Sequence, residues 1–150
     1  MFRDFDPTLA YNIVSSDTGL YMDISHASLS PGAIVDTWAS NGSSNQKFFL
    51  ERVSNVNESG TYRIHAVGSN LYLDMAGASK VDGGGLVQYG YSGASNQLWN
   101  LVQVKDSTYI ITNVNSGRIL ARGAAAGAQV TQNGQGSYSD NQMWRIKIAP

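Results

Sequence analysis

Asn45-Gln46-Lys47-Phe48 is the first of three Asn-Gln-x-aromatic stretches, and the others are Asn96-Gln97-Leu98-Trp99 and Asn141-Gln142-Met143-Trp144. They recur at about a third of the 150-residue length, which is typical of a repeat architecture. A tyrosine that opens an expected strand recurs in step with them, at Tyr11, Tyr62 and Tyr109. Two markers that share one period indicate three repeats, which we place at about residues 11–53, 62–104 and 109–148.

Each repeat shows the pattern of four short strands separated by turns. In the first repeat, alternating residues at 11–15 and 20–24 flank an Asp-Thr-Gly turn, which is typical of a hairpin. Further strands are expected at 33–38 and 48–50, and the second repeat copies this plan without a gap. No segment has the 3.6-residue apolar period of a helix. The sequence therefore predicts an all-β fold.

Twelve short strands in three units favour closure into a threefold barrel with a hairpin cap, because closure removes exposed sheet edges. We expect one such domain over residues 1–150. The motif glutamines should hydrogen-bond local backbone. The residues expected to fill equivalent core positions are Phe48, Trp99, Trp144, Ile13, Ile64, Ile111, Leu50, Leu101 and Ile146.

Composition argues against several functions. The chain has no cysteine, which removes thiol nucleophiles and thiolate metal sites. Its net charge is −1 with 14% charged residues and scattered basic side chains, so nucleic acid is not an expected partner. No apolar run is long enough to span a bilayer, and the stretch Met1–Asp6 does not resemble a secretory signal. We expect a soluble, cytoplasmic protein, or one released without standard export, that does not insert into membranes.

The three motifs, in register with the strand pattern, resemble those of the ricin B-type β-trefoil lectins, particularly the small cysteine-free members from fungi and bacteria. The likeness covers about residues 11–148, and the first motif departs from it with Phe48 in place of Trp. The resemblance implies a non-enzymatic carbohydrate-binding protein without cofactors, specific for galactose or N-acetylgalactosamine. It further implies glycans as partners, cross-linking by the chain or its homodimer, and a defensive role.

In this family a repeat can build a shallow sugar site from an Asp on its second strand, an aromatic on its third strand and the Asn before the motif Gln. A carboxylate accepts hydrogen bonds from sugar hydroxyls, an aromatic ring offers an apolar face, and an amide both donates and accepts. The corresponding residues are Asp23, Trp38 and Asn45, with His26 close enough in sequence to touch ligand, and Asp74, Tyr89 and Asn96.

The third repeat lacks most of this set. Ala121 stands where the Asp belongs, and the segment 133–136 contains no aromatic residue. We therefore expect two working sites and one vestigial site. Simpler interpretations remain open at this point, because the two aspartates could be hairpin-turn acids and the two aromatics could be core residues.

Two other classes of function are open to a chain with this pattern. A trefoil protease inhibitor would act through an exposed loop, for which 80–85 is the candidate. An enzyme is not expected, because no nucleophile, metal cluster or pair of acidic residues emerges from the sequence. His26 and His65 fall in different repeats and lack the spacing of a metal site.

Overall fold

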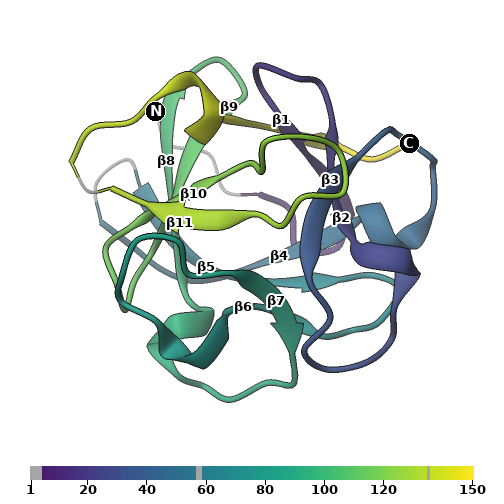
Figure 1. The fold of residues 1–150 in the computed structure, drawn as a ribbon, viewed down its shortest axis with the longest axis horizontal. Coiled ribbons are helices and arrows are strands. Elements are labelled where there is room, and N and C mark those ends of the chain that lie inside the picture. Colours follow the sequence, from purple (N-terminus) through teal and green to yellow (C-terminus); the bar gives the residue numbers. More distant parts are fainter. Residues whose placement is uncertain (1–4, 57–58, 135) are drawn as a thin grey trace.

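The computed structural model describes residues 5–56, 59–134 and 136–150 (Figure 1). These residues form twelve strands: β1 (Tyr11–Ser15), β2 (Tyr21–Ile24), β3 (Val35–Trp38), β4 (Phe48–Val56), β5 (Ser59–Ala66), β6 (Tyr72–Met75), β7 (Leu86–Tyr89), β8 (Trp99–Lys105), β9 (Thr108–Asn113), β10 (Ile119–Ala121), β11 (Thr131–Asn133) and β12 (Trp144–Ile148). Their helical segments are five single 3-10 turns: η1 (Ser25–Ala27), η2 (Ser44–Gln46), η3 (Ala76–Ala78), η4 (Ser95–Gln97) and η5 (Asp140–Gln142). The predicted all-β class is confirmed.

Six strands close into a barrel. β1 pairs with β4, β4 with β5, β5 with β8, β8 with β9, β9 with β12, and β12 with β1, all antiparallel. Because this ring is closed, its strands leave no edge free for pairing with another chain. The other six strands form the hairpins β2–β3, β6–β7 and β10–β11, which join the barrel through β1, β5 and β9. This arrangement is the predicted β-trefoil.

The three hairpins are linked in a cycle. A cap loop in each repeat donates a backbone hydrogen bond to the third strand of the next repeat. The bonds run from Gly32 to Gln88, from Gly83 to Gln132 and from Gly127 to Thr37, with N···O distances of 2.7, 2.8 and 2.9 Å. The cycle returns from the third repeat to the first, so the cap loop of repeat three lies against the hairpin of repeat one.

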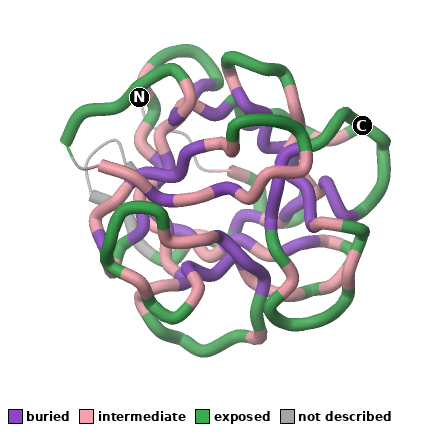
Figure 2. Tube along the Cα trace, viewed as in Figure 1, coloured by how far each residue is buried: buried purple, intermediate pink, exposed green. Residues whose placement is uncertain are grey.

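The motif aromatics fill the core as predicted. Phe48, Trp99 and Trp144 are fully buried, and the six aliphatic residues expected beside them are buried as well. Figure 2 shows this division, with buried stretches along the strands and exposed stretches on the outer loops. The two indole N–H groups donate to the carbonyls of Leu73 and Leu120 at 3.2 and 3.1 Å. Phe48 has no such donor but keeps the aromatic packing.

The tyrosines that mark the repeats converge on one residue. Phe5 lies against Tyr11, Tyr62 and Tyr109, with ring centroids 5.2, 5.6 and 5.3 Å apart. These distances are within the range of favourable edge and tilted aromatic contacts. The threefold symmetry of the strands therefore extends to their aromatic side chains, with a single N-terminal ring between them.

The strand predicted at 48–50 is too short, because β4 continues to Val56 along β5, with an irregularity in pairing between Arg52 and Ser54. Most of the stretch Met1–Asp6, on which the expectation about export depends, lies outside the described residues.

Candidate functional site

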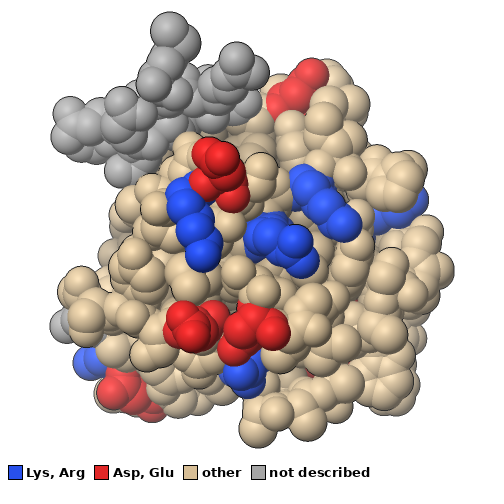
Figure 3. All heavy atoms as spheres, turned by 90° about the horizontal axis from the view of Figure 1, so that it is seen from above, with Lys and Arg blue, Asp and Glu red and all other residues tan. Residues whose placement is uncertain are grey.

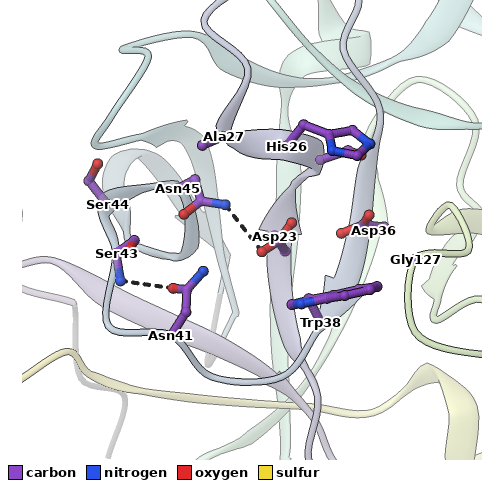
Figure 4. A pocket seen from close by; sticks show the side chains of 11 residues that line it. Asp23, His26, Ala27, Asp36, Trp38, Asn41, Ser43, Ser44, Asn45 and Gly127 are labelled. Carbon is purple, nitrogen blue, oxygen red and sulfur yellow. Dashed lines mark hydrogen bonds between the residues drawn. The ribbon is translucent and has the colours of Figure 1, made fainter.

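A pocket of 440 Å³ opens beside the hairpin of repeat one (Figure 4). It lies between β2 with η1, β3, the loop that leads into β4, and the cap loop of repeat three. The lining residues are Asp23, Ser25, His26, Ala27, Asp36, Trp38, Asn41, Ser43, Ser44, Asn45 and Gly127. All four residues predicted for the first site therefore line one pocket.

Strand pairing places the acid and the aromatic on one face. β2 and β3 pair so that Asp23 lies opposite Asp36, and Tyr21 lies opposite Trp38. Alternate residues of a strand point to the same side, so Trp38 faces the pocket with Asp36. Trp38 is 49% exposed and is therefore not a core residue. Asp23 lies inside a strand and is 5% exposed, so it is not a hairpin-turn acid.

Two amides hold the Asp23 carboxylate. Asn45 Nδ2 and Gln46 Nε2 donate to Asp23 Oδ2 at 3.2 and 2.9 Å. The glutamine also binds local backbone as predicted, donating to the Ala39 carbonyl and accepting from the Asn41 N–H at 2.9 and 3.0 Å. Its contact with the carboxylate was not predicted. The motif glutamine thus connects the loop before β4 to the acid of the hairpin.

Repeat two contains the same network. Asn96 and Gln97 donate to the carboxylate of Asp74 at 3.2 and 2.9 Å. Burial raises the pKa of Asp74 above its ordinary value, and the bonds from Gln97 and Asn96 act in the opposite direction. Tyr89 lies opposite Tyr72 on the neighbouring strand and is 52% exposed, so it is also not a core residue.

The two hairpins differ at the turn that follows the acid. His26 in η1 and Gly77 in η3 both have a left-handed backbone, with φ of 57° and 63°. Glycine adopts this conformation readily, whereas histidine does so less often. Repeat one therefore carries an imidazole at the rim of its pocket, where repeat two has no side chain.

Repeat three keeps the structural half of the network. Gln142 Nε2 donates to the Asn133 carbonyl at 2.7 Å, and Gln142 Oε1 accepts from the Ser139 N–H at 2.9 Å. Ala121 offers no carboxylate, and the register that pairs Ile119 with Asn133 puts Asn133 where the aromatic would stand. Gln135, in the loop predicted to lack an aromatic, lies outside the described residues.

Asp36 is the main residue that the sequence interpretation missed. Its carboxyl group lies within hydrogen-bonding contact of Asp23, and the residue is only 4% exposed. Burial, and then the neighbouring Asp23, raise the pKa of Asp36 to about 7. The structure therefore contains a pair of facing acids that the sequence interpretation did not identify. Asp36 stands two residues before Trp38 on the same strand, and this spacing was the signal that could have revealed it.

This pair does not have the geometry of a glycosidase. The two catalytic carboxyls of such enzymes stand about 5–9.5 Å apart, on either side of the bond they cleave. Asp23 and Asp36 are in direct contact, which leaves no room for a sugar between them. Among the described residues there is also no group of three or more His, Cys, Asp or Glu side chains that could hold a metal ion.

The surface shows no concentrated charge on the face seen in Figure 3, where basic and acidic side chains are interspersed among uncharged residues. Two ion pairs tie elements together across repeats: Arg118 with Asp82, and Arg122 with Asp17, each at 2.7 Å.

No helix in the described part of the chain is long and apolar enough to cross a membrane.

The model of the ricin-type β-trefoil lectin domain-like family matches residues 4–57, 52–133 and 96–150. The chain belongs to this family. The designed threefold-symmetric protein ThreeFoil is 35% identical, with a TM-score of 0.84 over 91% of this chain and 96% of ThreeFoil. A sequence comparison with curated proteins finds no match.

Two further solved structures share the fold. The exo-β-1,3-galactanase 1,3Gal43A from Clostridium thermocellum is 28% identical with a TM-score of 0.86, and the match covers 99% of this chain but 31% of that one. The ricin B-like lectin of Macrolepiota procera, solved in complex with lactose, is 16% identical with a TM-score of 0.76 over 97% of this chain and 99% of that lectin. Family and fold together support a non-enzymatic carbohydrate-binding protein.

Proposed function

We propose that this protein is a lectin that binds galactose or N-acetylgalactosamine in repeats one and two. One observation carries the proposal: an amide-held carboxylate lies on the same hairpin face as a half-exposed aromatic ring in both repeats. Repeat three keeps the fold but has neither group. The network is therefore more than a requirement of the trefoil.

The chemistry of the two sites suits a neutral sugar. In repeat one both amide bonds end on Asp23 Oδ2, so the other oxygen is not used by them and can accept from a sugar hydroxyl. Trp38 and Tyr89 offer flat apolar faces to the C–H side of a pyranose ring. The preference for galactose is supported by the family and by the printed lactose complex of the Macrolepiota procera lectin.

Such open sites with few contacts should bind one sugar weakly, with a Kd around 1 mM, or about −4 kcal/mol. Two sites that engage one glycan-covered surface together would gain roughly 10²–10⁴ in avidity. Two sites per chain, or a homodimer of such chains, would cross-link glycoconjugates. This arrangement fits a defensive agglutinin, made in the cytoplasm or released without standard export.

No observation favours the alternative of a protease inhibitor. The candidate loop at 80–85 is held to repeat three: Gln132 Nε2 donates to the carbonyl of Val81, and Arg118 Nε donates to that of Lys80, at 3.0 and 2.8 Å. An inhibitory loop that pairs with a protease as an extended strand needs these main-chain groups for the protease. Here they already serve the fold.

The test is calorimetric titration with galactose, N-acetylgalactosamine and lactose. The wild type should bind about two sugars per chain, and Asp23→Ala or Asp74→Ala should each leave about one. Asn141→Ala is the matched control, because it truncates the equivalent asparagine of repeat three and should change nothing. Binding that survives in the Asp23→Ala, Asp74→Ala double variant would contradict the proposed sites.

A further inference from the structure

The pairing of two carboxyl groups is confined to repeat one. Asp23 lies opposite Asp36 across β2 and β3, and the two side chains are in contact. At the equivalent positions, Asp74 lies opposite Val87 in repeat two. In repeat three the facing residues are Ala121 and Thr131. The candidate sites of repeats one and two therefore differ by one complete acidic group.

The lining of the pocket supplies this pair with uncharged donors and with no lysine or arginine. Both amide donors end on Asp23 Oδ2. Against burial and the contact with Asp23, hydrogen bonds from the Ser25 side chain and from backbone lower the pKa of Asp36, but its Oδ1 atom is buried without a hydrogen-bond partner. Asn45 Oδ1 is a second buried acceptor without a partner. The lining residues include no lysine or arginine, and His26 at the rim is the one among them that can carry a positive charge. A buried carboxylate without a positive partner is costly, and a proton kept on the pair lowers this cost.

We propose that the pocket of repeat one takes an amino sugar with a free, cationic amine, such as galactosamine, and that Asp23 and Asp36 hold its ammonium group. This proposal rests on the lectin function proposed above and names the ligand class of one of its sites. An ammonium group brings three N–H donors and one positive charge. It would replace the shared proton, which leaves to solvent, and make charge-assisted bonds to the two carboxylates.

Trp38 adds a second reason for this choice. It stands two residues after Asp36 on the same face of β3, and it is half-exposed at the pocket beside both carboxyls (Figure 4). The face of an indole ring attracts cations as well as apolar C–H groups. The same pocket should repel sugars that carry a carboxylate. An N-acetylated amine is neutral and would leave the carboxyl pair holding its proton.

The experiment uses the Asp74→Ala variant, in which only the site of repeat one should bind sugar. This variant is titrated with galactosamine, galactose and N-acetylgalactosamine at pH 7. A chelator is present so that divalent cations do not occupy the carboxyls. Galactosamine should bind about tenfold more tightly than galactose. Titrations in buffers of different ionisation enthalpy should show proton release with galactosamine alone. Asp36→Asn keeps the shape of the protonated acid, and in it the preference and the proton release should both disappear while galactose still binds.

Repeat two supplies the reciprocal test. In Asp23→Ala, which leaves only that site, galactosamine and galactose should bind equally, and adding Val87→Asp should create a preference for galactosamine. Thermal unfolding of each variant verifies that it is folded. If galactose binds but the preference is absent, or survives Asp36→Asn, the inference is overturned and the lectin proposal stands. If no sugar binds any form, both fall.

Discussion

Repeats one and two share a network and differ in the face they offer to a ligand. The Gln-to-Asp bonds measure 2.9 Å in both, and the Asn-to-Asp bonds 3.2 Å. Beside this common frame, repeat one has Asp36 and His26 where repeat two has Val87 and Gly77. The amides and the aspartate that they hold are the same in both repeats, whereas the residues beside them on the ligand-facing side differ.

Repeat three separates these two requirements. Gln142 still binds the loop backbone on both sides, although the carboxylate it would hold is replaced by Ala121. The glutamine therefore has a structural task that does not depend on a ligand site. In repeats one and two, the same glutamine also holds the aspartate of the candidate site.

The largest effect should come from removing that glutamine. Gln46→Ala leaves the Asn41 N–H without its acceptor and takes one donor from the buried Asp23 carboxylate. We expect a loss of about 2–4 kcal/mol in the free energy of unfolding, measured by chemical denaturation, because partners are left unpaired. Calorimetry should show loss of one sugar site. Gln97→Ala should do the same to repeat two.

Gln142→Ala is the control that separates stability from binding. It removes the bonds to the backbone of Ser139 and Asn133 but touches no acid, so the protein should lose about 1–3 kcal/mol and keep both sites. A loss of sugar binding in this variant as large as in Gln46→Ala would show that the glutamines act only through overall stability.

The sequence predicted the frame better than the ligand face, for a physical reason. The motif aromatics and strand periods recur three times, and each recurrence supports the others, so the barrel and its core could be predicted from the sequence. The three residues of each sugar site came from the family resemblance and stay a prediction. The contact of Asp36 with Asp23 depends on the register of two strands, and no repeat carries it a second time. The approach of Gly127 to Trp38 depends on closure of the whole cap, which no local pattern reports.

A second prediction concerns pH and the unmatched acid. Asp36 keeps its proton in the folded state up to a pKa of about 7, whereas the unfolded chain releases it near 3.8. The folded state therefore binds more protons between these values, and stability should fall as pH rises from about 4 to 7. Asp36→Asn removes this cost and should raise the free energy of unfolding by about 1–3 kcal/mol at pH 8, with little change at pH 4.

Val87→Asp makes the same comparison in reverse. It places a second acid opposite Asp74, so it should destabilise the protein at pH 8 more than at pH 4. Denaturant titrations of each variant at pH 4 and pH 8 measure the free energies of unfolding. Equal effects of Asp36→Asn at pH 4 and pH 8 would mean that the pair does not retain a proton.

The third prediction compares the two exposed rings. Trp38→Ala and Tyr89→Ala each remove a ring that is about half-exposed, so each should change stability by less than about 1 kcal/mol. Sugar affinity at the altered site should fall about five- to tenfold, because the apolar face is lost. Calorimetric titration measures the affinity of Trp38→Ala in the Asp74→Ala variant and of Tyr89→Ala in the Asp23→Ala variant. Chemical denaturation measures the stability of each. If either change leaves its site at full affinity, that ring is not part of the binding surface.

The smallest effect should come from the glycine that repeat three places beside the first site. Gly127 has φ of 86°, and a Cβ added there would lie 3.2 Å from Cζ3 of Trp38. Gly127→Ala should therefore cost about 1 kcal/mol of stability from its backbone and shift the indole by a few tenths of an ångström. Galactose affinity at repeat one should fall about twofold.

Gly32→Ala is the matched change in the cap loop that repeat one places against repeat two. Its φ is 87°, and no atom lies within 4 Å of the added Cβ. It should cost the same stability and leave the affinity of repeat two unchanged. The fluorescence of Trp38, the one tryptophan that is half-exposed, should shift with Gly127→Ala and not with Gly32→Ala. Equal effects on both sites would show that the backbone, and not contact with Trp38, transmits the change, and would remove repeat three from the wall of the first site.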